Sequence, residues 1–159
     1  VLLHVAALQG LAREHMTRAQ GWRFLDMGCR IERAAYLASV LERALCSPEA
    51  DSPSALELVL ELADSSITYQ SRYSVLPEIA SVYDLVIMDD TNPRSLRFQF
   101  DQLLKHYERL PRVRESALPD PAHRLLIDCQ VRLRLLDPRE LHECGGRWRE
   151  SFWISTSGL

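Results

Sequence analysis

Apolar residues recur along most of this chain at steps of three, four and seven, which is the spacing of one face of an α-helix. The longest such run extends from Trp22 to about Leu45. The pattern predicts helices over 1–18, 22–45, 54–73, 77–89, 92–110 and 125–136, a short turn over 139–144, and a helix beginning near Trp148. We therefore expect an all-α fold, a bundle of about six to seven helices with short loops.

Residues typical of helix caps indicate where several of these helices begin. Ser54 stands three residues before Glu57, the spacing of a capping box. Asn92 precedes a proline, which fits the first position of a helix. Prolines and small polar residues mark loops at 47–53 and 112–121. We therefore expect helices to start at Ser54 and at Asn92.

The composition is that of an ordinary globular protein. The chain has 159 residues, of which 47% are hydrophobic and 26% charged, so one helical domain over 1–159 is expected. The chain begins with valine, and we expect it to be a piece of a longer protein. A net charge of −3 gives no reason to expect a nucleic acid or a membrane as partner. Four widely spaced cysteines favour reduced thiols in the cytoplasm, with Cys29 and Cys129 in the core.

Two charged residues flank the apolar stripe expected on the 22–45 helix. That stripe is made by Trp22, Leu25, Cys29, Tyr36 and Val40. On a helical wheel of about 100° per residue, Glu32 and Arg33 lie within about 60° of its centre. This placement indicates either a polar pocket in the core of the bundle or charges at the edge of the stripe that reach water.

A second group of polar residues lies near the end of the 54–73 helix. Ser65, Tyr69 and Arg72 are spaced so that they share one helical face, next to Asp64. A hydroxyl, a phenol and a guanidinium on one face are able to contact one ligand. The alternative interpretation is an ordinary polar outer face.

A third group surrounds the expected start of the 92–110 helix. Asp89 precedes Asn92, and Arg94 and Ser95 fall in the first turn. Free backbone N–H groups at a helix N-terminus favour an anion, and an arginine strengthens such a site. The alternative is that Asn92 is only a cap.

The sequence contains no motif of a known cofactor site. Glycine-rich phosphate-binding loops and the Gly-x-Ser-x-Gly motif are absent, so no cofactor is predicted. His142, Glu143 and Cys144 are metal-ligating types, but successive helical positions do not face one ion. No metal site is therefore predicted.

Four stretches of the chain together resemble the bacterial alpha-E family, a helical domain with a characteristic Glu-Arg pair, here Glu32-Arg33. The resemblance is carried by residues 16–18, 21–34, 64–73 and 89–96 and covers about 10–111. Members are about twice as long, and this chain resembles the C-terminal half of one. The resemblance implies that nine residues form one interior polar cluster: Glu32, Arg33, Asp64, Ser65, Tyr69, Arg72, Asn92, Arg94 and Ser95.

The same resemblance implies a functional context. Family genes commonly neighbour, or are fused to, a circularly permuted ATP-grasp ligase and a transglutaminase-like peptidase. The first hypothesis is therefore a helical accessory or scaffold domain in ATP-dependent peptide or amide ligation. The alternative is an enzyme or ligand-binding domain in which Arg33, Arg72 and Arg94 hold a carboxylate or phosphate and Glu32 or Asp64 transfers a proton. Apolar surface left exposed is expected to meet the missing N-terminal half or a second copy.

Overall fold

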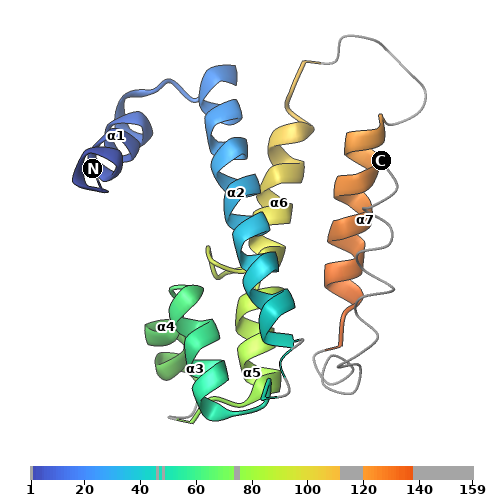
Figure 1. The fold of residues 1–159 in the computed structure, drawn as a ribbon. Helices are drawn as coiled ribbons and strands as arrows, with labels where there is room; N and C mark the ends of the chain where they lie inside the picture. The colour runs from blue at the N-terminus through green and yellow to red at the C-terminus, as the bar shows by residue number, and fades with distance from the viewer. Residues whose placement is uncertain (1, 46, 48, 74–75, 112–119, 138–159) are drawn as a thin grey trace.

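The computed structural model describes residues 2–45, 47, 49–73, 76–111 and 120–137. Within them lie seven α-helices and one π-helix and no strand, which confirms the expected all-α fold (Figure 1). The elements are α1 (Leu2–His15), α2 (Gln20–Leu45), α3 (Pro53–Leu62), α4 (Ser66–Arg72), α5 (Ile79–Tyr83), η1 (Asp84–Met88), α6 (Leu96–Tyr107) and α7 (Pro121–Leu135). The turn expected over 139–144 and the helix expected near Trp148 lie outside the described residues.

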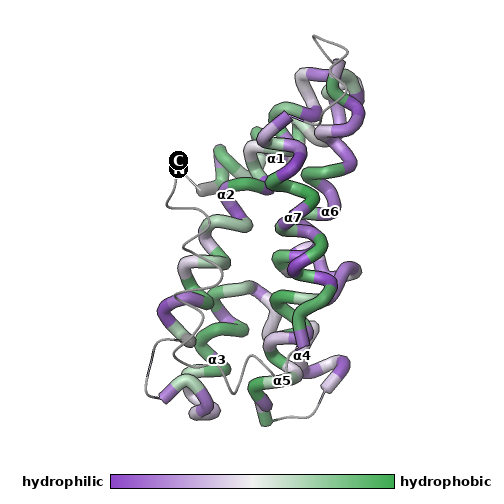
Figure 2. Tube along the Cα trace, turned by 90° about the vertical axis from the view of Figure 1, so that its right-hand side faces the viewer, coloured by the Kyte–Doolittle hydropathy of each residue, from purple (hydrophilic) through white to green (hydrophobic). Residues whose placement is uncertain are grey.

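Three long helices, α2, α6 and α7, run side by side with alternating chain direction, and the short helices α3 to η1 lie around one end of them (Figure 1). Along α7, hydrophobic and hydrophilic positions alternate (Figure 2). The hydrophobic core forms where the short helices meet the long ones. It contains Ala34, Leu37, Leu41, Leu56, Val59, Leu60, Ala63, Tyr69, Val82, Tyr83, Leu85, Val86, Ile87, Leu96 and Leu133.

The prediction of a single helix over 54–73 is wrong, because the helix is interrupted at Asp64. Asp64 has a φ of 51°, in the left-handed region that aspartate tolerates better than most residues. The N–H of Ser65 donates to the carbonyl of Leu60 at 2.8 Å, and that of Asp64 to Glu61 at 2.9 Å. These two bonds form a Schellman motif, which ends α3 and turns the chain into α4.

Two expected helix starts are also displaced. Ser52 rather than Ser54 caps α3, where its Oγ accepts from the N–H of Ala55 at 3.3 Å and Pro53 occupies the first turn. Ser95 rather than Asn92 caps α6 and accepts from the N–H of Phe98 at 3.1 Å. In both cases the hydroxyl of the capping serine accepts from the backbone N–H three residues further along the chain.

The helix expected over 77–89 is divided, and the one expected over 125–136 is longer. The first consists of α5 followed by the π-helix η1. The second begins at Pro121, because Asp120 accepts from the N–H of His123 at 2.9 Å and the proline fits the first turn. Cys29 and Cys129 are half-buried free thiols, so their expected place in the core is wrong.

The apolar stripe expected on α2 is wrong in phase. Leu25 and Tyr36 are 47% and 54% exposed, whereas Ala34, Leu37 and Leu41 are buried. On the same helical wheel the centre of the buried face lies at about 90°, whereas the expected stripe was centred at about 340°. Large apolar residues suggested the wrong side because small ones form part of the helix contact. Alanine lets a neighbouring helix approach closely.

Helix α1 stands away from the other helices (Figure 1). Its side chains from residue 3 to residue 11 are all exposed, including Leu3 at 84% and Leu8 at 69%. The helix has only 14 residues, against the roughly 20 that cross a membrane. Among the described residues, no helix is both long and apolar enough to span one.

Candidate functional site

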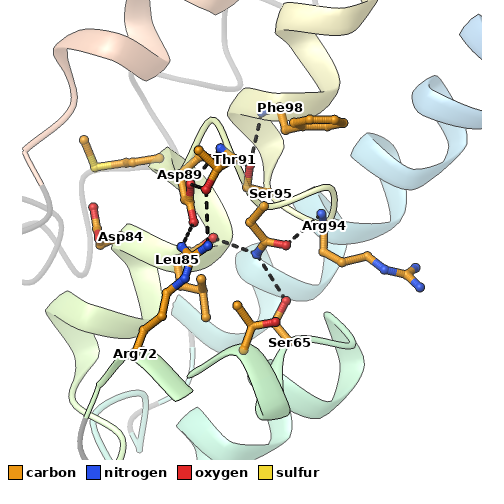
Figure 3. Close-up of polar contacts among 12 residues, drawn as sticks. Ser65, Arg72, Asp84, Leu85, Asp89, Thr91, Arg94, Ser95 and Phe98 are labelled. Atoms are coloured by element: carbon orange, nitrogen blue, oxygen red, sulfur yellow. Dashed lines mark hydrogen bonds and ion pairs between the residues drawn. The ribbon is translucent and has the colours of Figure 1, made fainter. Parts of the chain in front are cut away.

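Asn92 lies at the centre of a buried group of polar contacts. Asn92 is only 4% exposed. Its Nδ2 donates to the carbonyl of Leu85 at 3.0 Å and to Oγ of Ser65 at 3.4 Å. Its Oδ1 accepts from the N–H of Arg94 at 3.0 Å (Figure 3). One amide thereby connects the start of α4, the π-helix η1 and the turn before α6.

Ser95 fixes the other side of that turn. It is fully buried, and its Oγ donates to the carbonyl of Asp89 while accepting from the N–H of Phe98 (Figure 3). The side-chain oxygens of Asn92 and Ser95 thus occupy N–H groups near the start of α6. This arrangement favours the interpretation of Asn92 as a structural turn residue over a free anion site.

Arg72 connects α4 to the same turn. Its guanidinium pairs with the carboxylate of Asp89 and donates to Oγ1 of Thr91 at 3.2 Å. Thr91 in turn donates to Asp89 through both its N–H and its hydroxyl, each at 2.7 Å. Burial acts to raise the pKa of Asp89, but the hydrogen bonds from Thr91 and Arg72 outweigh it, so the pKa lies below its usual value.

Asp64 and Arg94 form an ion pair at the outer edge of this group. Their side chains are 72% and 45% exposed, and the Arg94 guanidinium points away from Leu85 (Figure 3). Exposed pairs contribute at most about 1 kcal/mol. We define the turn network as Asp64, Ser65, Arg72, Asp89, Thr91, Asn92, Arg94 and Ser95.

Tyr69 is buried beside the turn network but its hydroxyl serves another segment. That hydroxyl accepts from the N–H of Glu78 at 3.0 Å and donates to the carbonyl of Leu76 at 3.4 Å. Its ring stacks on Tyr73 at 5.0 Å between centroids. Burial, together with a hydrogen bond to Asp84, raises the pKa of Tyr73 to about 12. Ser65, Tyr69 and Arg72 therefore contact three different targets instead of one.

Glu32 and Arg33 lie on α2, apart from the turn network. Glu32 is exposed and Arg33 is half-buried. On the helical wheel the buried face of α2 is centred at about 90°. Glu32, at about 280°, therefore lies on the opposite side of the helix. The structure thus brings six of the nine expected residues into the turn network, places Tyr69 beside it, and leaves this pair elsewhere.

A second buried group of polar residues lies between α2 and α6, and the sequence analysis missed it. Arg30 donates to Asp26 at 2.7 Å and to Oε1 of Gln99 at 3.3 Å. Nε2 of His106 lies 2.7 Å from the same Asp26 carboxylate. We define the α2–α6 network as these four residues. The spacing of Asp26 and Arg30, four residues apart in a stretch that resembles the family, was the available signal.

His106 is the most enclosed titratable residue of the α2–α6 network. It is 6% exposed, and Trp22 packs edge-on against its ring at 5.3 Å. Its Nδ1 is buried without a protein partner. Burial acts to raise the pKa of Asp26, but hydrogen bonds from Arg30 and His106, and their charges, bring it below its usual value.

Gln99 connects the two networks. Its Nε2 donates to the carbonyl of Pro93, in the turn network's loop, while its Oε1 accepts from Arg30. Polar contacts therefore continue from α4, through the turn before α6, to α2. Within the described residues, no three His, Cys, Asp or Glu side chains are grouped to hold a metal ion. The hydrogen bonds and ion pairs of the two networks therefore hold together helices that are distant in sequence.

Comparison with known proteins shows which family the chain belongs to. The family model of Alpha-E, described as a predicted alpha-helical domain with a conserved ER motif, matches residues 1–153. The chain belongs to the Alpha-E family. Uncharacterized proteins of Mycobacterium tuberculosis (strain H37Rv) and Mycobacterium bovis are 33% identical to it over 145 residues. The match covers 89% of this chain but only 16% of each of those proteins. No solved structure matches the chain.

Proposed function

We propose that this Alpha-E domain is a helical accessory or scaffold domain of an ATP-grasp-linked peptide or amide ligation system. The observation that carries the proposal is that the polar cluster is internally paired. Arg72 and Arg94 each pair with a carboxylate of this chain, and Asn92 makes three contacts within it. Such a network holds helices in place and leaves the surface for partners.

One further observation supports the accessory role. The Mycobacterium relatives contain the matched stretch as 16% of a much longer chain, which is how an accessory unit attached to other domains is arranged. The ligation context comes from the family resemblance, which also supplies the expected partners: an ATP-grasp ligase or a transglutaminase-like protein.

Co-purification with the ATP-grasp ligase of the same genome tests the proposal. We expect the full chain to retain the ligase, and ligase output to fall when the chain is left out. Arg72→Ala and Arg94→Ala are expected to leave that retention unchanged, because both arginines act within the domain. No retention, together with normal ligase output without the chain, contradicts the proposal.

The alternative function is binding of a carboxylate- or phosphate-bearing ligand. It is favoured by the exposure of the two arginine side chains, 43% for Arg72 and 45% for Arg94, which lets an anion compete with Asp89 and Asp64. Calorimetric titration with inorganic phosphate and with glutarate distinguishes the functions. A ligand site predicts binding that Arg94→Ala abolishes. Arg132→Ala, at 43% exposure and paired with Asp128, is the matched control.

A further inference from the structure

An apolar groove lies between α2, α6 and α7. It has a volume of about 500 Å³. Small residues of α2, such as Ala35 and Ala38, line it together with Phe100 and Leu103 of α6 and Leu125 of α7. Leu125 is 45% exposed. A groove of this kind on an otherwise folded helical body is a place where an apolar helix binds.

Helix α1 has the composition of such an occupant. Its apolar residues do not form one stripe: on a helical wheel they are spread around the whole circumference. Leu3, Val5, Leu8 and Leu11 are between 50% and 84% exposed. The polar residues Gln9, Arg13 and Glu14 fall in the second half of α1, so its first turns carry apolar residues on all sides. A helical segment of that kind is normally buried against other helices. Neither α1 nor the groove has a partner among the described residues of one copy.

Helix α1 is at least as long as the groove. The 14 residues of α1 extend about 21 Å at 1.5 Å per residue. Along α2 the groove runs from Met27 to Ala38, which is about 17 Å by the same rise. The helix is therefore long enough to fill the groove, and the alanines on its α2 side permit close approach.

We propose that two copies of this chain associate by exchanging α1, so that the α1 of each copy lies in the α2–α6–α7 groove of the other. A two-fold exchange covers both surfaces of both copies and closes on itself. Half the lateral surface of a cylinder about 21 Å long and about 10 Å wide is roughly 330 Å². With matching groove area and two contacts the total is roughly 1,300 Å², within the range of specific interfaces.

Sedimentation velocity of the full chain between about 1 and 100 µM tests the proposal, with folding of each variant checked by circular dichroism. We expect a dimer that Leu3→Glu/Leu8→Glu weakens at least about tenfold, since two charges would enter an apolar groove. The matched control is Ile67→Glu/Leu58→Glu, at 85% and 54% exposure on α4 and α3. It is expected to leave the dimer unchanged.

The groove is tested separately on α7. Leu125→Glu is expected to weaken the dimer, and Leu135→Glu, at 79% exposure outside the groove, is its control. Mixing the α1 variant with the groove variant then decides how the surfaces pair. One intact α1 meets one intact groove only in the mixed dimer, so the mixture is expected to associate more strongly than either variant alone.

Several outcomes overturn the proposal. The proposal is wrong if the chain stays monomeric up to 100 µM. It is also wrong if the α1 variant or the groove variant does not weaken the dimer, or if mixing the two variants does not restore association. Alkylation of Cys129, which lines the groove, identifies one specific alternative. Slow alkylation in a monomer that becomes fast in Leu3→Glu/Leu8→Glu shows that α1 covers the groove of its own chain.

Discussion

At the scale of single residues, Asn92 does more than its position in a loop suggests. Three segments meet at one side-chain amide, which contacts Leu85, Ser65 and the backbone of Arg94. Because the site is buried, water does not replace a lost partner there. The stability of the turn before α6 therefore depends on this residue more than on the exposed charges around it.

Asn92→Ala is expected to lower the free energy of unfolding by about 2 kcal/mol, because the carbonyl of Leu85 and the N–H of Arg94 lose their partner. Urea denaturation measures it, with the slope of the transition unchanged. Asp64→Asn, which removes only the exposed pair with Arg94, should cost less than about 1 kcal/mol. Equal losses in the two variants would contradict this assignment.

Asp26 makes the stability of the fold depend on pH. Its pKa is lower in the folded chain than its ordinary value, so its contribution is present above about pH 5 and is lost as the pH falls through the folded pKa. Asp89 acts in the same direction. We expect the urea midpoint to fall between pH 5 and pH 3. In Asp26→Asn that fall should be shallower, from a midpoint already lower at pH 7. An equally steep fall in the variant would show that Asp26 is not responsible.

At the scale of elements, one residue in the left-handed region decides how α3 and α4 are arranged. Asp64 ends α3, and the turn that it makes brings Ser65 to Asn92. A sequence pattern does not reveal this break, because both helices carry apolar residues in phase across it. The expected continuous helix was wrong for that reason.

Substitutions at Asp64 test this backbone requirement. Asp64→Gly and Asp64→Val both remove the ion pair with Arg94, but only glycine adopts positive φ without strain. The valine variant is therefore expected to be less stable than the glycine variant by about 1 kcal/mol. Thermal unfolding of the two proteins measures the difference. Equal stability would show that this turn changes its conformation at little cost.

The sequence pattern predicted the elements better than their faces. Each long helix exists near its expected position, because apolar periodicity extends over many residues. Helix starts moved by two to four residues, since several serines and prolines compete as caps. The face of α2 was mispredicted because Ala34 is buried although its side chain is small, whereas hydrophobicity alone favours Leu25 and Tyr36.

At the scale of the whole molecule, α7 is attached by few fully buried side chains. Leu133 is 1% exposed and joins the core, while Leu135, two residues further on, is 79% exposed. Gln130 and Arg134 reach Asp101 of α6 at 2.6 Å and 3.6 Å. The docking of α7 on the body therefore depends strongly on one leucine.

Leu133→Ala is expected to cost about 2–4 kcal/mol, because it leaves a cavity in the core. Leu135→Ala should change the free energy of unfolding by less than about 0.5 kcal/mol. Urea denaturation of both variants measures the difference. A small loss in Leu133→Ala would indicate that α7 shifts to fill the space.

The candidate site was predictable only in part at this scale. The resemblance located the segments 64–73 and 89–96, and the structure joins them in the turn network. The α2–α6 network was not foreseen, because it pairs residues on two helices whose relative rotation no local pattern encodes. Gln99 and His106 acquire their partners on α2 only through the packing of α6 against that helix.

The α2–α6 network also has a consequence for synthesis on the ribosome. Its contacts join Arg30 to Gln99 and Asp26 to His106, which are 69 and 80 positions apart. At a translation rate of about 5–20 residues per second, Gln99 and His106 are synthesised roughly 4–16 s after their partners on α2. During that interval a 26-residue helix whose core residues Ala34, Leu37 and Leu41 are not yet fully covered is a natural substrate for a chaperone on the nascent chain.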